Sequence, residues 1–372
     1  MAVGIICEYN PFHNGHLYHL TKIKELYNNE EIILVLGGNF LQRGNLSIID
    51  KYKKTEIALF YGVDLVVELP FVYSTQSSDI FAKGALELLN TLNCNTLVFG
   101  SESNDIEKLK ELAKIQINNL EYEKLVKEEL NNGINYPTAM SNALKKLNND
   151  TINTPNDILA LSYIKEIIKN NYNITPISIK RTNDYHSTNL IQEISSATAI
   201  REGIKNKKDI RKFIPDFTYQ NIKYNDESTN YFKLLKYKIL SEQKEIKKYQ
   251  TVDEGIENRI IRYINKCNTL EELIEKFKTK RYTYNKINRM FTHILCSLEK
   301  KEAKEQKIKY IRILGFNNKG KDYLNKIKKE IKIPIITKLT KNNYDLLKKD
   351  INRDYIYSLI KEIDNDFKII IK

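Results

Sequence analysis

Three of the five histidines of this 372-residue chain lie within seven residues, in the segment Glu8-Tyr9-Asn10-Pro11-Phe12-His13-Asn14-Gly15-His16-Leu17-Tyr18-His19. His13 and His16 are three residues apart, so both imidazoles can face the same side of a helix that begins near Gly15. The N-terminus of a helix offers unpaired N–H groups and positive dipole charge, which suit an anion such as a triphosphate. We therefore expect the two imidazoles to stabilise charge that develops during displacement at phosphorus.

Two other interpretations of these histidines stay open. They could form a metal site, although Glu8 is the single acidic residue beside them, or they could only cap a helix. The four cysteines are far apart and form no C-x-x-C pair, so we expect reduced thiols, without a disulfide framework or a thiolate zinc site. The P-loop pattern G-x-x-x-x-G-K-[ST] is absent, which disfavours a P-loop nucleotidase.

The elements that must position the histidines alternate between strand and helix. Apolar runs typical of buried parallel strands occur at 2–7, 31–36, 64–69, 95–99 and 175–179. Helical spacing occurs at 15–26, 50–61, 79–92 and 156–168, with Asp50 placed to cap the second of these helices. This alternation predicts an α/β fold with a doubly wound parallel sheet, whose ligand crevice lies beyond the carboxyl ends of the strands.

The positive charge of the chain belongs to its second half. Residues 216–372 hold 36 Lys and Arg against 22 Asp and Glu, a surplus of 14, whereas residues 1–215 hold 24 against 25. This asymmetry favours a polyanion-binding region, although a general bias toward Lys codons stays open as an explanation. Lys-rich helices are expected at 231–249 and 271–278, and the tyrosines of 280–286 could stack on unpaired bases. We therefore expect a catalytic domain over 1–215 and a basic, mainly helical region over 216–372.

The chain has no apolar run of the ~20 residues that a membrane helix needs, and no secretory signal at its start. We therefore expect a cytoplasmic protein.

Two motifs resemble the signatures of the nucleotidyltransferase superfamily. The H-x-G-H pattern of His13 to His16 follows the first predicted strand, as in that superfamily. Its second signature, a Ser/Thr-rich turn that opens a helix, is similar to Ile194-Ser195-Ser196-Ala197-Thr198-Ala199-Ile200-Arg201. Ser195 or Ser196 would cap this helix, its N–H groups would receive the β- and γ-phosphates, and Arg201 would supply a cation.

Further stretches closely resemble the bacterial tRNA(Met) cytidine acetate ligase family. They are CEYNPFHNGHLYH, GGNFLQRGNLSIIDKY, ELPFVYSTQSSDIFAKGA, FGSES, PNDILALSYIK, IKRTNDYH, ISSATAIR and, in the basic tail, RILGFNNKGKDYL. Cys7 departs from the Ala of the family pattern, and a small thiol is expected to be harmless there.

The resemblance implies a two-step reaction. ATP and acetate give acetyl-adenylate and pyrophosphate, and N4 of the wobble cytidine of elongator tRNA(Met) then takes the acetyl group, with ATP accompanied by Mg2+ and without acetyl-CoA. His13 and His16 would be catalytic, and Arg43 and Lys51 are candidate tRNA contacts. The implied ATP site comprises Cys7, Glu8, Tyr9, Asn10, Pro11, Phe12, His13, Asn14, Gly15, His16, Leu17, Tyr18, His19, Leu20, Gly100, Asn156, Arg181, Ser195, Ser196 and Arg201.

Two other function classes stay open. A small-molecule adenylyltransferase of the pantetheine-phosphate or nicotinamide-mononucleotide type would share the H-x-G-H fold, but it would not need the basic second half. A non-catalytic RNA-binding protein with a vestigial nucleotide fold is disfavoured because both signatures are intact.

Overall fold

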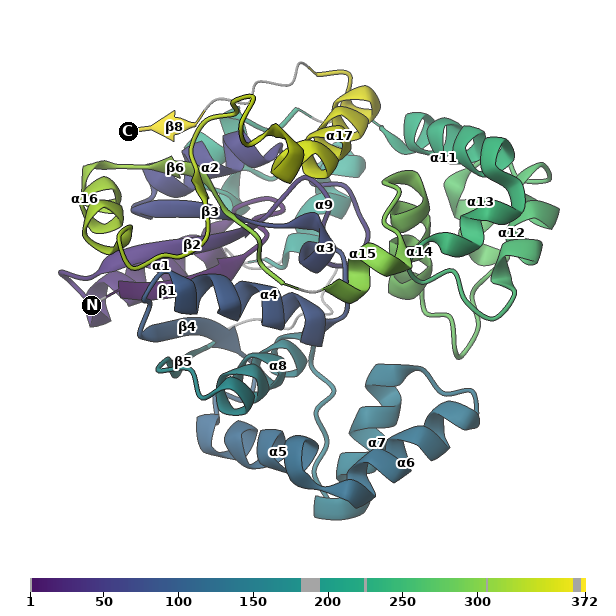
Figure 1. Ribbon diagram of the computed structural model, residues 1–372, viewed down its shortest axis with the longest axis horizontal. Coiled ribbons are helices and arrows are strands. Elements are labelled where there is room, and N and C mark those ends of the chain that lie inside the picture. The colour runs from purple at the N-terminus through teal and green to yellow at the C-terminus, as the bar shows by residue number, and fades with distance from the viewer. Residues whose placement is uncertain (1, 182–194, 224–225, 306, 364–368) are drawn as a thin grey trace.

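The parallel core of the central sheet comes from the first half of the chain. A computed structural model describes residues 2–181, 195–223, 226–305, 307–363 and 369–372. Five strands run parallel in the spatial order β5-β4-β1-β2-β3. They are β1 (Ala2–Cys7), β2 (Glu31–Gly37), β3 (Leu65–Leu69), β4 (Thr96–Ser101) and β5 (Thr175–Lys180). The predicted α/β fold with a parallel central sheet is therefore confirmed (Figure 1).

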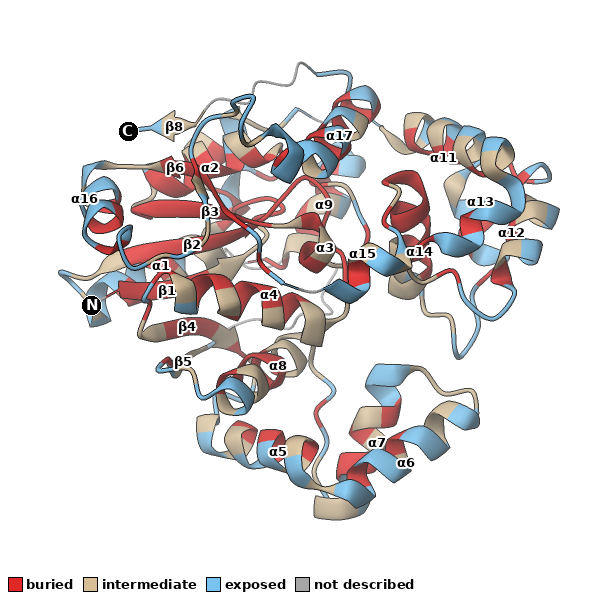
Figure 2. Cartoon of the chain, viewed as in Figure 1, coloured by how far each residue is buried: buried red, intermediate tan, exposed pale blue. Residues whose placement is uncertain are grey.

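Both faces of this sheet are buried under helices. Successive side chains of a strand point to opposite faces, so each strand contributes to two cores. In β1, Val3 and Ile5 pack in a core with Leu20 and Ile23, whereas Ala2 belongs to the core on the other face. In Figure 2 the central strands are accordingly coloured as buried along most of their length. Helices α1 (Asn14–Leu26) and α2 (Lys51–Phe60) cover one face, and α4 (Ser78–Thr91) and α8 (Pro155–Asn170) cover the other. Asp50 caps α2 as predicted, accepting the N–H groups of Tyr52 and Lys53.

The remaining helices extend this layered body in two directions. Near β4 and α8 lie α5 (Ile106–Asn118), α6 (Leu120–Asn131) and α7 (Tyr136–Asn148), and α3 (Phe71–Ser74) follows β3. After β5 come α9 (Ala197–Lys205), η1 (Arg211–Phe213), α10 (Asp216–Gln220), α11 (Ser228–Glu242), η2 (Gln243–Lys248), α12 (Ile256–Ile264), α13 (Leu270–Glu275), α14 (Tyr284–Leu295) and α15 (Lys300–Glu305). Helices α11 to α14 share a core of their own, visible as a separate lobe in Figure 1. No described helix is both long enough and apolar enough to span a bilayer.

Three further strands of the sheet come from the C-terminal part of the chain. Strand β6 (Ile311–Phe316) pairs antiparallel with β3, and β7 (Ile335–Ile336) and β8 (Ile370–Ile371) pair with β6. Helices α16 (Asn318–Ile327) and α17 (Tyr344–Lys361) complete this part. The sheet thus draws on both halves of the sequence, and the division at residue 215 stays a prediction. The helix expected over 231–249 is interrupted at Gln243, which adopts a positive φ of 52°.

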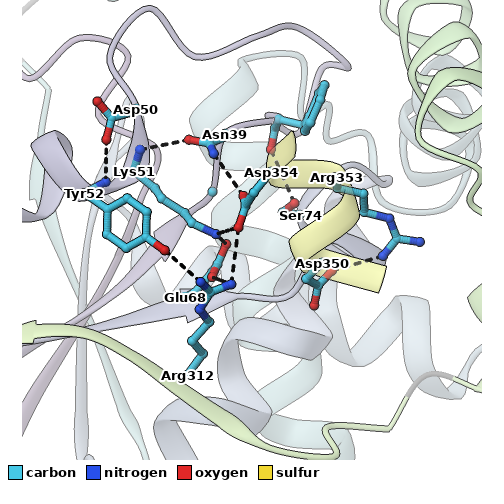
Figure 3. Close-up of polar contacts among 12 residues, drawn as sticks. Asn39, Asp50, Lys51, Tyr52, Glu68, Ser74, Arg312, Asp350, Arg353 and Asp354 are labelled. Atoms are coloured by element: carbon cyan, nitrogen blue, oxygen red, sulfur yellow. Dashed lines mark hydrogen bonds and ion pairs between the residues drawn. The ribbon is translucent and has the colours of Figure 1, made fainter. Parts of the chain in front are cut away.

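A buried cluster of charges holds α17 and β6 against α2 and β3. Lys51 Nζ lies 2.7 Å from Glu68 Oε1 and 2.6 Å from Asp354 Oδ2, and its side chain is 0% exposed. The Arg312 guanidinium lies 3.2 Å from Glu68 and 3.4 Å from Asp354. Asn39 donates to Asp354 and accepts the N–H of Lys51. Figure 3 shows these side chains pointing toward one another.

This cluster corrects one expectation from the sequence. Lys51 was expected to be a contact for tRNA, but its ammonium is enclosed by two carboxylates and is closed to solvent. Lys51 therefore holds helix α17 against strand β3, and it is not placed to contact tRNA.

Removing Lys51 should strongly destabilise the fold. Lys51→Met leaves Glu68 and Asp354 buried with one cation between them, and breaking such a pair costs about 3–5 kcal/mol of unfolding free energy. Lys53→Met, on the exposed face of the same helix, should change it by less than about 0.5 kcal/mol. Urea denaturation of both variants measures the difference. Equal stabilities would show that the cluster does not hold the two halves together.

Candidate functional site

The two histidines of the H-x-G-H segment cap helix α1 with reciprocal hydrogen bonds. His13 Nδ1 accepts the N–H of Gly15 at 3.0 Å, and His16 Nδ1 accepts the N–H of His13 at 3.2 Å. The two rings lie with their centroids 3.9 Å apart. The histidines therefore do cap the helix, but this uses only one nitrogen of each ring.

The same hydrogen bonds fix the proton on each imidazole. A ring whose Nδ1 accepts an N–H carries its own proton on Nε2 when neutral. Burial, together with the charges of Arg181 and Arg201, lowers the pKa of His13 to about 3. Burial and the neighbouring His13 also hold the pKa of His16 well below its usual value. Both rings are thus neutral at pH 7, and no hydrogen bond to another described residue uses their Nε2–H groups.

His13 and His16 both line a large cavity at the carboxyl ends of the strands. Its volume is about 870 Å³, and its walls come from β1, α1, the turn before α9 and helix α14. Sixteen of the residues singled out from the sequence line it: Cys7, Glu8, Tyr9, Asn10, His13, Gly15, His16, Tyr18, His19, Arg43, Gly100, Asn156, Arg181, Ser195, Ser196 and Arg201. The cavity lies where a doubly wound sheet binds its ligands.

Other residues singled out from the sequence lie behind this wall. Phe12 and Leu20 are buried in the core between α1 and the sheet. Asn14 donates to the main-chain oxygen of Lys212. Pro11 and Leu17 are likewise not among the lining residues of the cavity. Residues 182–186 of the IKRTNDYH stretch and Ile194 lie outside the described part of the chain.

The serine turn and the H-x-G-H segment meet at this cavity. Ser196 caps α9, and its hydroxyl accepts the N–H of Ala199 at 3.0 Å. Arg201, one turn further along, donates to Asn10 O at 2.8 Å and to Thr198 Oγ1 at 3.0 Å. Two segments are therefore joined directly by residues that are 191 positions apart in sequence.

A third group lies at the ends of β4 and β5. The Arg181 side chain lies across Gly100, where an added Cβ would be 3.3 Å from Arg181 Cγ. Asn156 Nδ2 donates to Glu102 Oε1, which orients the amide beside the cavity. Asp157 accepts hydrogen bonds from the turn after β4, including Ser101 Oγ at 2.5 Å. Glu102 and Asp157 were not anticipated from the sequence.

Lys54 was also not anticipated from the sequence. Its buried ammonium donates to Glu8 O, Gly37 O and Gly38 O at 2.7–2.9 Å, one acceptor for each N–H. Burial lowers its pKa to about 7. Lys54 thereby fixes the carboxyl ends of β1 and β2 at the floor of the crevice. The sequence holds no signal that distinguishes this lysine from its exposed neighbour Lys53.

His293 connects α14 to the end of helix α3 and was also not anticipated. Its Nε2 donates to Thr75 O at 2.7 Å, and its Nδ1 lies 3.0 Å from Thr251 Oγ1. The residue is 0% exposed, and burial lowers its pKa to about 4. It therefore stays neutral at the pH of the cell.

This arrangement suits the binding and activation of a polyphosphate. Two neutral N–H donors stand at the N-terminus of α1, and Arg181 and Arg201 supply positive charge on the neighbouring walls. Donors that are fixed before the reaction stabilise charge on phosphate oxygens without reorganising. Among the described residues, no group of three or more His, Cys, Asp or Glu side chains could hold a metal ion.

Comparison with known proteins supports this description. The HIGH Nucleotidyl Transferase family profile matches residues 1–368. The tRNA(Met) cytidine acetate ligase of Clostridium acetobutylicum is 39% identical over 386 residues, which cover 97% of this chain and 96% of that protein. The crystal structure of apo Thermotoga maritima TmcAL superposes with a TM-score of 0.90 at 32% identity, covering 100% of this chain and 99% of that one. The same protein bound with alpha-thio ATP gives a TM-score of 0.85 at 32% identity, with 97% and 95% covered.

The low pKa of His293 should make stability depend on pH. The unfolded chain binds a proton at this residue near pH 6.5, whereas the folded chain does so only near pH 4, so stability falls as pH falls through this window. At pH 5 the loss is about 2 kcal/mol for this residue. His293→Gln keeps an N–H donor for Thr75 O and has no group that titrates. Urea denaturation at pH 7 and 5 should show a loss about 2 kcal/mol smaller in the variant, and an unchanged pH dependence would contradict the assignment.

Proposed function

Because the chain belongs to the tRNA(Met) cytidine acetate ligase family of HIGH nucleotidyl transferases, we propose that it acetylates N4 of the wobble cytidine of elongator tRNA(Met). The acyl donor in this proposal is free acetate, activated by ATP, and acetyl-CoA takes no part. The observation that carries the proposal is the meeting of the H-x-G-H segment, Arg181 and the serine turn around one cavity. A cytoplasmic location is part of the proposal, because ATP and tRNA are both available there.

In the first step, an acetate oxygen attacks the α-phosphorus of ATP and pyrophosphate leaves. The Nε2–H groups of His13 and His16 donate to α-phosphate oxygens, where negative charge increases in the transition state. The N–H groups at the start of α9 and the cations Arg181 and Arg201 receive the leaving phosphates. Mg2+ accompanies the nucleotide on its phosphate oxygens, as Mg2+ generally does.

In the second step, the N4 amino group attacks the carbonyl carbon of acetyl-adenylate, and AMP leaves. A cytosine amine is a poor nucleophile, so activation of the acetyl group is the chemically effective use of ATP. The mixed anhydride is hydrolysed by water, so transfer to tRNA has to take place before the intermediate leaves the cavity. The target base must leave the stack of the anticodon loop to enter the cavity. The basic second half and Arg43 are the proposed tRNA-binding elements.

One reconstitution tests the whole proposal. The protein is incubated with ATP, labelled acetate and unmodified tRNA(Met) transcript, and the nucleosides are analysed by mass spectrometry. We expect one N4-acetylcytidine for each AMP and pyrophosphate formed, and none with a transcript that carries uridine at the wobble position. Acetylation by acetyl-CoA without ATP would contradict the proposed donor. Adenylyl transfer to a phosphorylated small molecule without tRNA would favour the adenylyltransferase alternative.

Two variants of His16 separate its role in catalysis from its role as a cap. His16→Ala should lower acetate-dependent exchange of pyrophosphate into ATP by about 100-fold or more, as loss of one transition-state donor does. His16→Gln restores an acceptor for the His13 N–H in a capping box, so it should recover stability but little exchange. Lys22→Ala, on the exposed part of α1, is the control and should match the wild type. Full exchange in the glutamine variant would show that His16 acts only as a cap.

A further inference from the structure

Gln76 brings a buried donor without a hydrogen-bond partner to the wall of the cavity. The residue is 3% exposed, and it lines the same cavity as His13 and His16. No described residue forms a hydrogen bond with its Nε2 atom. A buried donor that stays unpaired costs free energy, so such groups are generally paired with protein or with a bound molecule. Gln76 belongs to the stretch ELPFVYSTQSSDIFAKGA, none of whose residues is part of the implied ATP site.

The main chain that carries Gln76 is held on two sides. Thr75 O accepts a hydrogen bond from Nε2 of His293, which belongs to α14, at 2.7 Å. Ser74 Oγ donates to Phe40 O, in the loop after β2, at 3.4 Å. The position of Gln76 is therefore fixed before a ligand binds, as preorganised recognition requires.

The order of the strands separates Gln76 from the residues implied in ATP binding. The parallel strands lie in the order β5-β4-β1-β2-β3, and the H-x-G-H segment follows β1 at the centre. Gly100 and Arg181 lie at the ends of β4 and β5, on one side of the histidines. Gln76 follows β3 and the short helix α3, on the other side. A nucleotide on the β4 side therefore leaves the β3 side of the cavity for the second substrate.

The chemistry of this side of the cavity suits the edge of a nucleobase. The loop after β2 and the lobe of α11 to α14 contribute further amide and hydroxyl side chains to the lining, namely those of Gln42, Asn45, Gln250, Thr251 and Asn285. Proteins read a base that has left its stack by hydrogen bonds to its Watson–Crick edge. Cytosine presents the acceptor N3 at this edge, next to the N4 amine, whereas uracil presents an N–H there. An amide N–H donor such as Gln76 Nε2 therefore matches cytosine and opposes uracil.

We propose that Gln76 binds the target cytidine, with Nε2 donating a hydrogen bond to N3 of the base. This inference rests on the proposed function, because it places the base that receives the acetyl group. Gln76 acts as a positioning residue, since a hydrogen bond to N3 orients the adjacent N4 amine in the cavity. It takes no part in forming acetyl-adenylate. Adenine also has an acceptor at its Watson–Crick edge, so a contact with ATP is the competing outcome that the test must separate.

A base analogue tests the contact together with Gln76→Met, which keeps the side-chain length but removes the donor. Acetyl transfer is measured as kcat/KM for tRNA(Met) that carries cytidine or 3-deazacytidine, in which C–H replaces N3, at the wobble position. The substitution should lower kcat/KM about tenfold or more with cytidine. With 3-deazacytidine it should lower kcat/KM less than about twofold, because the partner of Nε2 is already absent. The intrinsic reactivity of the analogue cancels, since only the effect of the substitution is compared. Equal losses with both bases would overturn the proposal.

Gln116→Met is the matched control. Gln116 lines the same cavity and also has a buried Nε2 atom without a partner, but it belongs to α5, which lies away from α3 and α14 in Figure 1. Its Oε1 accepts a hydrogen bond from Lys165. The control should keep the wild-type ratio of kcat/KM between the two bases. A loss specific to cytidine in Gln116→Met as large as that in Gln76→Met would refute a direct contact at Gln76.

Exchange of pyrophosphate into ATP without RNA separates the base from the small substrates. Gln76→Met should keep the wild-type KM values for ATP and acetate, which also shows that the variant is folded. A raised KM for either would overturn the proposal, because Gln76 would then serve the first step.

Binding of the two tRNAs separates this inference from the proposed function. In filter binding, the wild type should bind the cytidine tRNA about two- to tenfold more tightly than the 3-deazacytidine tRNA, and Gln76→Met should bind both alike. If the wild type shows this preference but forms no N4-acetylcytidine, the base site stands and the proposed reaction fails. A wild type that binds both tRNAs alike would refute the contact with N3.

Discussion

The reciprocal hydrogen bonds between His13 and His16 are the constraint on which the site depends. They begin helix α1 at the end of β1, and they use the Nδ1 atom of each ring, so the Nε2–H groups remain for a ligand. Structural and chemical roles are therefore combined in the same two side chains. Burial keeps both rings neutral, which lets them donate hydrogen bonds without adding charge to a site that already contains Arg181 and Arg201. The sheet assembles the other residues of the site, because the carboxyl ends of its parallel strands bring segments from distant parts of the chain to one edge.

The two halves of the chain are joined by buried polar contacts as well as by apolar packing. Lys51 and Arg312 neutralise Glu68 and Asp354 inside the body, which fixes α17 and β6 beside α2 and β3. His293 performs a similar task for α14 by donating to Thr75 O. These contacts hold helix α14, which lines the cavity, against the body of the protein.

Much of the fold and part of the site could be predicted from local patterns. The run AVGIIC became β1 over the predicted residues, and Asp50 caps α2 as predicted, because apolar runs and capping residues act over a few neighbours. Lys51 and Lys54 could not be distinguished from exposed lysines, because their burial depends on partners up to 303 residues away. The return of β6 to the sheet was missed for the same reason, since antiparallel pairing with β3 leaves no local signal. The motif residues around the cavity were found because a resemblance carries information on long-range contacts that spacing alone does not contain.

Measuring the protonation state of His13 and His16 tests most directly whether their Nε2–H groups are available as neutral donors. Long-range proton–nitrogen correlation spectra of protein labelled with 15N-histidine distinguish a neutral ring protonated on Nε2, one protonated on Nδ1, and the cation. His13→Gln and His16→Gln variants assign the signals. We predict that at pH 7 both rings are neutral with the proton on Nε2, and that both stay neutral as the pH is lowered to 5. A cationic ring at pH 7, or a proton on Nδ1 of either residue, would contradict it.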